Sequence, residues 1–249
     1  MKGKIVGIAG RARVGKDTTA SIMNYILTVG VPRAKYEEWI TKQSVYDKIL
    51  KERSIHCADL LKDICSSLFG IGRALFDDGE YKDNRYYWIE TGKFLRKEQL
   101  PKEAKVINIQ DFEDFNIGLC DRPTLSYFIK QSNGYSFLTL RTILQYFGTN
   151  ICREQLFNDI WVKATMTKAT DIANTYGYCF IPDIRFKNEA DAVTKSSLYG
   201  GLIEIKRNVV QHSHSSENID FQCSHVFDNN STKMSLFYKC LEFVQNNLI

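Results

Sequence analysis

The sequence predicts an α/β fold in which a doubly wound, mostly parallel sheet carries helices on both faces. Two observations support this prediction. The segment 4–9 is a short, continuous apolar run that opens into glycine, which is typical of a strand buried on both faces. In the last third of the chain, apolar runs alternate with segments of helical periodicity, as they do when helices connect the strands of a parallel sheet.

The predicted elements follow one another in a regular order. The strands are short apolar runs, and they span residues 4–9, 54–57, 178–182, 201–206 and 225–227. The helices repeat apolar residues at helical spacing, and they span residues 18–29, 59–69, 140–147, 156–173, 188–197 and 231–248. Gly70 and Gly148 are expected to end two of these helices, because glycine readily adopts the left-handed conformation that follows a helix C-terminus.

Residues 71–137 are rich in Tyr, Asp, Lys and Phe and show no sustained period. We expect an insertion there, with short helices and a hairpin. Because the predicted elements on both sides of it belong to one sheet, we expect residues 1–249 to form a single domain that carries this insertion.

The composition excludes several classes of protein. Lys and Arg number 33 against 29 Asp and Glu, and the net charge of +4 suits an anionic substrate but is too small to predict nucleic-acid binding. No apolar run reaches the roughly 18 residues that span a bilayer, and the N-terminal residues lack the apolar stretch of a signal peptide. The seven cysteines form no C-x-x-C pair, so we expect buried thiols rather than disulfides or zinc. We therefore expect a cytoplasmic protein without membrane contact.

Between the first strand and the first helix lies the G-x-x-x-x-G-K motif of a phosphate-binding loop. Its glycines let successive N–H groups face the phosphates, while Lys16 and the N-terminus of the next helix add positive charge. The motif and its context predict a P-loop NTPase fold and ATP as cofactor. The residues expected to bind ATP are Gly10, Arg11, Ala12, Arg13, Val14, Gly15, Lys16, Asp17 and Thr18. Arg11 and Arg13 are either solvated surface charges or cations that reach a phosphate.

Asp17 stands where this motif usually has Ser or Thr, whose hydroxyl binds Mg²⁺. Thr18 or Thr19 can supply a hydroxyl instead, or Asp17 can hold the ion through water, since Mg²⁺ keeps several waters in protein sites. We therefore expect Mg²⁺ at Asp17 and Thr18.

Further polar residues follow the predicted strand 178–182. Asp183 and Arg185 come at its carboxyl end, where ligands of open α/β sheets bind, and they are suited to Mg²⁺ and phosphate. The alternative is a salt-bridged turn in which Glu189 stabilises the start of the next helix. Earlier in the chain, Arg141 and Gln145 lie four residues apart and share one helical face.

These motifs resemble, in order along most of the chain, those of the bacteriophage-type deoxynucleoside monophosphate kinases, a P-loop family related to the nucleotide monophosphate kinases. The similar segments are 10–18 with its Gly-Lys-Asp-Thr ending, 56–63, 141–149, 159–162, 183–189, 214–217 and 228–231. Residues 85–137 match no motif of the family. The resemblance implies transfer of the γ-phosphate of ATP to a deoxynucleoside monophosphate for DNA precursor synthesis, and it points to a viral origin, which would place the enzyme in the host cytoplasm.

The motifs and the resemblance together imply roles for individual residues. The residues expected at the transferred phosphoryl group are Lys16, Arg13, Asp183 and Arg185. The residues expected to line the deoxynucleotide pocket are Lys62, Arg141, Gln145, Gly148, Thr149, Trp161, Arg185 and Glu189, and the insertion 71–137 would bind the monophosphate. Without the resemblance, Lys62 fits a solvated helix lysine and Trp161 a core aromatic residue.

Two alternatives remain from the sequence. A phosphomevalonate kinase of the animal type also uses a Gly-Lys-Asp loop, although the D-x-R-F-x-N-E and R-x-x-x-Q-x-x-G-T segments favour the nucleotide enzyme. A nucleotide-binding protein or NTPase switch without turnover fits less well, because cations gather at the matched motifs. These cations are Arg11, Arg13, Lys16, Arg141, Arg153, Arg185 and Arg207. No general base is expected, since the acceptor phosphate is already ionised. A homodimer is an open alternative to a monomer.

Overall fold

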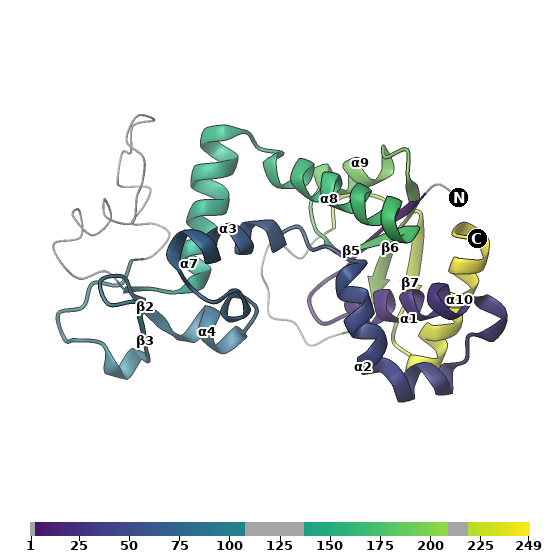
Figure 1. Ribbon diagram of the computed structural model, residues 1–249, viewed down its shortest axis with the longest axis horizontal. Coiled ribbons are helices and arrows are strands. Elements are labelled where there is room, and N and C mark those ends of the chain that lie inside the picture. Colours follow the sequence, from purple (N-terminus) through teal and green to yellow (C-terminus); the bar gives the residue numbers. More distant parts are fainter. Residues whose placement is uncertain (1–2, 108–136, 209–218) are drawn as a thin grey trace. The chain divides into compact units, whose positions relative to one another are not determined.

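The computed structural model describes residues 3–107, 137–208 and 219–249. The chain divides into two compact units, the first formed by Met1–Cys57 with Val162–Ile249 and the second by Ala58–Trp161. The expected insertion 71–137 lies within the second unit, whose bounds are wider, and residues 108–136 of it are outside the described residues. Figure 1 shows the helices and strands of both units.

A four-stranded parallel sheet forms the centre of the first unit. Its strands are β1 (Lys4–Ala9), β5 (Tyr178–Ile184), β6 (Tyr199–Lys206) and β7 (His225–Asp228), in the order β5-β1-β6-β7. Val6 lies opposite Phe180 on one side and Gly201 on the other. The predicted strand 54–57 is only an isolated parallel bridge between Ser54 and Phe180, at the outer side of β5. All carboxyl ends therefore meet at one edge of the sheet.

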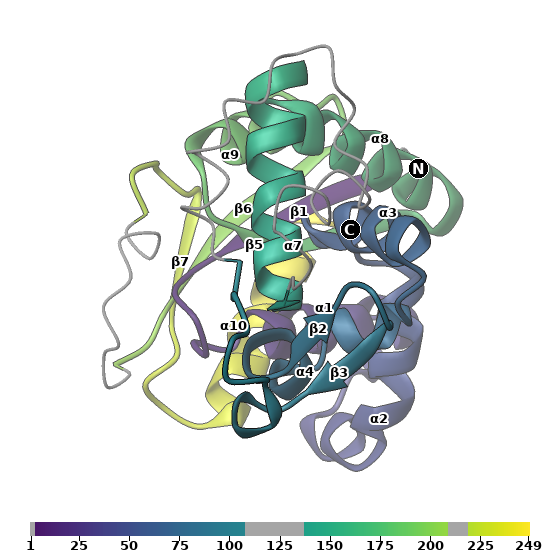
Figure 2. The ribbon, with the colours of Figure 1, turned by 90° about the vertical axis from the view of Figure 1, so that its left-hand side faces the viewer.

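Helices cover both faces of this sheet, as predicted. One face packs against α1 (Lys16–Val29), α2 (Tyr36–Glu52) and α10 (Lys233–Asn247), and the other against α8 (Ile160–Tyr176) and α9 (Lys187–Thr194). Side chains of β1 alternate between the two layers: Val6 and Ile8 join the first core cluster, and Ile5 and Ala9 join the second. Figures 1 and 2 show the sheet between these two layers.

The sequence predicts no helix between residues 30 and 53, whereas the structure has α2 there. Only Trp39, Tyr46 and Leu50 are buried in it. Their spacing follows the helical period, but charged residues surround them and conceal the apolar face. A short 3₁₀-helix, Val31–Arg33, leads into it.

The second unit combines short helices with a small antiparallel sheet. The helices are α3 (Asp59–Phe69), α4 (Gly79–Asn84) and α7 (Leu140–Gln145), with 3₁₀ turns at Arg73–Phe76 and Lys97–Gln99. Strand β2 (Tyr86–Trp88) pairs with β3 (Lys93–Leu95) and with β4 (Phe137–Leu138). The β2–β3 pair and the short helices confirm the hairpin and helices expected in this segment.

The predicted end of a helix at Gly148 is wrong. Helix α7 continues directly into a π-helix, Tyr146–Leu156. Gly148 lies inside this helix and is buried, and a Cβ atom there would come 2.6 Å from Cδ2 of Leu61. The glycine therefore permits close packing of two helices instead of ending one, a role that a one-dimensional pattern cannot distinguish from a helix stop.

The structure also tests the predictions of buried thiols and of a chain without a membrane-spanning segment. The six cysteines within the described residues are all unpaired, and Cys65, Cys152, Cys179 and Cys240 are buried, which confirms that they pack as small apolar side chains. Within the same residues, the structure contains no helix with the length and apolar character needed to cross a membrane.

Candidate active site

The loop between β1 and α1 has a backbone that requires glycine at two positions. Gly10 has a φ of 149° and Gly15 a φ of 104°, conformations that favour glycine. A Cβ atom at Gly10 would lie 2.7 Å from the carbonyl oxygen of Ile205, and one at Gly15 would lie 2.6 Å from Nδ2 of Asn229. The loop therefore makes the tight turn that the motif predicts, and neighbouring strands press against it.

Positive charge and backbone donors gather at the start of α1. Nζ of Lys16 donates to the carbonyl oxygens of Gly10, at 2.8 Å, and Arg11, at 2.7 Å, so the ammonium group lies over the loop. Gly15 precedes the helix and has no side chain to cap it. Because the first N–H groups of a helix have no partner within the helix, this end attracts anions.

A cavity of about 400 Å³ opens beside the loop. Arg11 and Val14 line it from the loop, and Lys206, Arg207 and Asn208 line it from the end of β6. Its size falls in the range of small-molecule sites. Glu204 also lines it and lies 3.4 Å from Nζ of Lys206, whereas Arg11 and Arg207 suit an anionic ligand. Of the predicted loop residues, Arg11, Ala12 and Arg13 are exposed, whereas Val14 is buried.

The residues after Lys16 separate into different roles. Oγ1 of Thr19 donates to the carbonyl oxygen of Gly15 at 2.9 Å, and Thr19 is fully buried, so its hydroxyl serves the loop backbone. Thr18 is half-buried one residue earlier. The side chain of Asp17 is 81% exposed. Of the candidate oxygens in this segment, those of Asp17 and Thr18 thus remain accessible to an ion.

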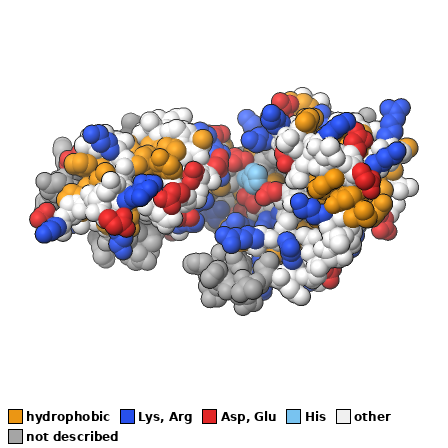
Figure 3. All heavy atoms as spheres, turned by 90° about the horizontal axis from the view of Figure 1, so that it is seen from below, with side chains coloured by type: hydrophobic (Ala, Val, Ile, Leu, Met, Phe, Trp, Pro, Cys, Tyr) orange, Lys and Arg blue, Asp and Glu red, His pale blue; other side chains and the backbone are white. Residues whose placement is uncertain are grey.

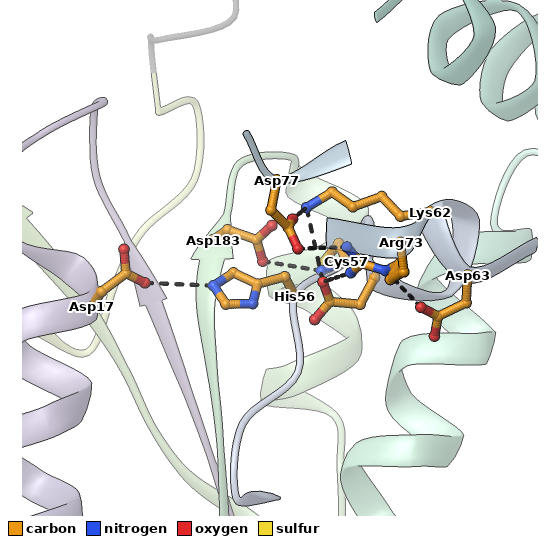
Figure 4. A network of polar contacts seen from close by, with 9 residues as sticks. Asp17, His56, Cys57, Lys62, Asp63, Arg73, Asp77 and Asp183 are labelled. Atoms are coloured by element: carbon orange, nitrogen blue, oxygen red, sulfur yellow. Dashed lines mark hydrogen bonds and ion pairs between the residues drawn. The ribbon is translucent and has the colours of Figure 1, made fainter. Parts of the chain in front are cut away.

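His56 lies against Asp17, a contact that the sequence analysis did not predict. Nε2 of His56 is 3.4 Å from Oδ1 of Asp17 (Figure 4). The hydrogen bond from His56, together with the positive charge of Lys16, lowers the pKa of Asp17 below its ordinary value. The carboxylate is therefore ionised at neutral pH, as a cation ligand must be.

Asp183 lies at the carboxyl end of β5, as predicted. The backbone N–H of Cys57 donates to its Oδ1 at 3.1 Å (Figure 4). Cys57 reaches this position because the N–H of Ile55 donates to the carbonyl oxygen of Phe180, which aligns the chain with β5. Burial, together with the negative charge of Asp183, raises the pKa of the Cys57 thiol well above its ordinary value, so this cysteine is not a thiolate nucleophile.

Glu189 stabilises the turn that carries Arg185. Its Oε2 accepts hydrogen bonds from the backbone N–H groups of Arg185, at 2.9 Å, and Phe186, at 3.2 Å. Glu189 is 4% exposed, whereas Arg185 is exposed. This geometry matches the helix-start alternative for Glu189, and its direct contact with substrate stays a prediction.

In the second unit, the predicted polar residues lie along α7 and the π-helix. Arg141 forms a two-pronged ion pair with Asp83, with distances of 2.7 Å and 3.1 Å. Gln145 and Thr149 are exposed. A π-helix holds more residues per turn than the about 3.6 of an α-helix, so residues four apart stay closer to one face. The π-helix therefore keeps Thr149 near the face of Arg141 and Gln145.

Gly148 and Trp161 lie beneath this face and belong to the core of the second unit. Nε1 of Trp161 donates to the carbonyl oxygen of Gly148 at 2.9 Å, and Trp161 is 4% exposed. The structure brings these two predicted residues together as a support, which agrees with the core interpretation of the tryptophan.

Lys62 belongs to a network of ion pairs within the second unit (Figure 4). Its Nζ is 2.7 Å from Asp77, and Arg73 contacts Asp63 at 2.6 Å and Asp59 at 3.0 Å. Although burial opposes it, the contacts with Lys62 and Arg73 lower the pKa of Asp77 overall. Lys62 is therefore not the solvated lysine that its sequence context alone suggests.

Two residues at the sheet edge, His56 and Asn229, had no role in the sequence prediction. Nδ2 of Asn229 donates to the carbonyl oxygen of Val14 at 2.7 Å, which joins the end of β7 to the phosphate loop. Both residues follow a strand or strand-like segment at the carboxyl edge of the sheet. This position is the feature of the sequence from which a role in the site could have been predicted. Residues 214–217, the H-x-S-E segment, lie outside the described residues.

The parallel sheet between two helical layers, with a glycine-bounded loop joining β1 to α1, is consistent with a P-loop fold like that of the nucleotide monophosphate kinases. Residues 82–238 match the family model described as deoxynucleotide monophosphate kinase. Because this match covers well over half of the chain, the protein belongs to the deoxynucleotide monophosphate kinase family, and its activity is phosphorylation of deoxynucleoside monophosphates, with ATP as the donor that such a kinase uses. A search of curated proteins gives no match.

This match decides between the functions that the sequence left open. It favours the nucleotide enzyme over a phosphomevalonate kinase and over a switch without turnover. The matched residues begin after the phosphate loop, so the assignment of the loop rests on its own geometry.

Proposed function

We propose that the first unit binds ATP at residues 10–18 and that the γ-phosphate passes with the aid of Mg²⁺ to the 5′-phosphate of the deoxynucleotide. The observation that carries this proposal is the loop itself, in which Gly10 and Gly15 require left-handed backbone and Lys16 lies over the carbonyl oxygens. A phosphate at the start of α1 receives backbone N–H donors and the ammonium group together. The adjacent cavity, lined by Arg11 and Arg207, accommodates the remainder of the nucleotide.

Arg13 and Arg185 supply mobile positive charge in this proposal. Both are exposed, and Arg185 lies in a turn that Glu189 holds in place. A transferred phosphoryl group carries its negative charge on the equatorial oxygens. The protein therefore has to position the two substrates and to neutralise this charge. The acceptor phosphate is already ionised, and no side chain has to remove a proton from it.

The oxygen atoms near the loop fit Mg²⁺. No group of three or more His, Cys, Asp or Glu side chains arranged for a metal occurs in the described part of the chain. Proteins usually hold Mg²⁺ through one or two carboxylates together with substrate phosphates, so such a group is not required for this ion. Asp17, Thr18 and Asp183 would hold it, and the ion would neutralise charge on the phosphates.

The second unit would bind the acceptor through the exposed face of α7 and the π-helix. Arg141 is suited to the monophosphate, because a guanidinium that binds Asp83 with two nitrogens binds phosphate in the same geometry. Gln145 and Thr149 would contact the nucleoside, Lys62 would add charge, and Gly148 with Trp161 would support the wall.

The remaining features agree with small-molecule substrates. On the face shown in Figure 3, Lys and Arg side chains are interspersed with Asp and Glu rather than gathered into one basic stripe. We propose ATP and a deoxynucleoside monophosphate as the partners, a place in DNA precursor synthesis in the cytoplasm, and no nucleic-acid partner.

A transfer assay with a matched pair of variants tests this proposal. The protein is incubated with γ-labelled ATP, Mg²⁺ and dAMP, dGMP, dCMP, dTMP, mevalonate 5-phosphate or water. We expect label on at least one deoxynucleotide and a loss of at least about 100-fold in kcat/KM for Lys16→Ala, because an electrostatic contact at the transferred group is removed. Lys48→Ala, an exposed lysine on α2, serves as the control and should retain activity. Equal activity of the two variants would refute the role of the loop.

A further inference from the structure

The turn after β7 is hydrogen-bonded to the backbone of the phosphate loop. Nδ2 of Asn229 donates to the carbonyl oxygen of Val14 at 2.7 Å, and the backbone N–H of Asn229 donates to the carbonyl oxygen of Lys206, also at 2.7 Å. A carbonyl oxygen only accepts hydrogen bonds, so the amide nitrogen must be the side-chain atom that faces Val14. One residue therefore joins β7, β6 and the loop.

This contact determines the direction of a backbone donor. In a trans peptide the C=O and N–H groups point to opposite sides, and none of the peptide bonds in the described residues is cis. With the carbonyl group of Val14 directed at Asn229, the N–H of Gly15 points away from Asn229. This N–H group belongs to the residue just before the start of α1. In the proposed function it is one of the donors that bind the phosphates of ATP.

Asn229 and Gly15 also fit together sterically. A Cβ atom at Gly15 would lie 2.6 Å from Nδ2 of Asn229, so the amide occupies the space beside the glycine. The φ of 104° at Gly15 belongs to the same arrangement. The glycine thus makes room for Asn229 as well as for the turn of the backbone.

Contacts on the far side keep Asn229 in place independently of the loop. The carbonyl oxygen of Asp228 accepts from Nζ of Lys239, and Oδ1 of Asp228 accepts from the backbone N–H of Asn230 at 2.8 Å. Oδ1 of Asn230 accepts from the backbone N–H of Asn208 at 2.7 Å. The turn is therefore a fixed support against which the loop rests.

We infer that Asn229 is a positioning residue for the phosphates of ATP: it holds the Val14–Gly15 peptide so that the N–H of Gly15 faces the bound anion. The inference rests on the proposed function of the loop. Asn229 does not touch the nucleotide, so its removal weakens the phosphate contacts and leaves the contacts to the nucleoside unchanged.

Calorimetric titration with two probes tests this separation. Inorganic tripolyphosphate reports on the loop, and adenosine reports on the adjacent cavity. For Asn229→Ala we expect at least about tenfold weaker binding of tripolyphosphate, the size of one hydrogen bond to a charged group, and unchanged binding of adenosine. Asn229→Asp keeps the shape beside Gly15 but places a carboxylate against the carbonyl oxygen of Val14, so the loss should be at least as large.

Asn247→Ala is the matched control, because Nδ2 of Asn247 also donates to a backbone carbonyl oxygen, that of Phe243 in α10, at 2.9 Å. It should bind both probes as the unaltered protein does. Unchanged tripolyphosphate binding in Asn229→Asp, or an equal loss for both probes, would overturn the inference. If the unaltered protein bound no tripolyphosphate, the proposed function of the loop would fail first, and the inference with it.

Discussion

The phosphate loop and the second unit present positive charge in different ways. In the loop, backbone donors at the start of α1 have no capping side chain, and Nζ of Lys16 donates to the carbonyl oxygens of Gly10 and Arg11. In the second unit, Arg141 is bound to Asp83 and Lys62 to Asp77. An anion that binds the backbone N–H groups of the loop displaces no carboxylate from them, whereas one at the cations of the second unit has to compete with carboxylates.

This difference has a physical basis. Backbone donors are held by the fold and cannot turn to find other partners, so they need no counter-charge in the absence of ligand. Long cationic side chains do turn, and nearby carboxylates keep them ordered. We expect the loop to act as a preformed site and the second unit as a site whose cations exchange partners on binding.

The largest expected effect follows from Gly15→Ala. A left-handed φ costs an L-residue about 1–2 kcal/mol, and the new Cβ would press against Asn229, so both the loop and its support would move. We expect a loss of at least about tenfold in kcat/KM for ATP, since about 1.4 kcal/mol corresponds to a factor of ten. Gly79→Ala is the control, since a Cβ atom there meets no atom within 4 Å. A loop that tolerates alanine would not be the preformed site described above.

A smaller effect of opposite sign is expected at Asp83. In Asp83→Ala the guanidinium of Arg141 no longer has a carboxylate to exchange for phosphate. Because exposed ion pairs contribute about 0.2–1 kcal/mol, the KM for the deoxynucleotide should fall about two- to fivefold, whereas Arg141→Ala should raise it. Initial-rate kinetics at saturating ATP measure both values. A higher KM in Asp83→Ala would mean that Asp83 orients Arg141 instead of competing for it.

The smallest effect concerns the dependence of stability on pH. The ion pairs lower the pKa of Asp77 in the folded protein, so they contribute stability above the ordinary carboxyl pKa of 3.8 and lose it as the pH falls through the lowered value. The melting temperature of Asp77→Asn should therefore lie slightly below that of the unaltered protein at pH 7, and the two should converge in acid. A difference that persists at pH 2 would have another origin.

The sequence predicted the sheet of the first unit closely and its site less completely. Strand β1 agrees with the predicted residues 4–9, and the strands and helices of the last third differ from prediction by a few residues at their ends. Helix α2 was not predicted, because its three buried residues are separated by charged residues. The sequence did not predict that the helix continues past Gly148, because packing against Leu61, and not a local conformational preference, requires glycine there.

By itself, the sequence determined the parallel α/β architecture and the position of the phosphate loop, because continuous apolar runs and glycines of required conformation act over a few neighbouring residues. Only the tertiary structure decided which side chains complete the loop. Asn229 and Val14 are 215 residues apart, and His56 and Asp17 are 39 apart. Such contacts depend on the order of strands in the sheet, which brings distant carboxyl ends to one edge, and no local pattern records which side chains meet there.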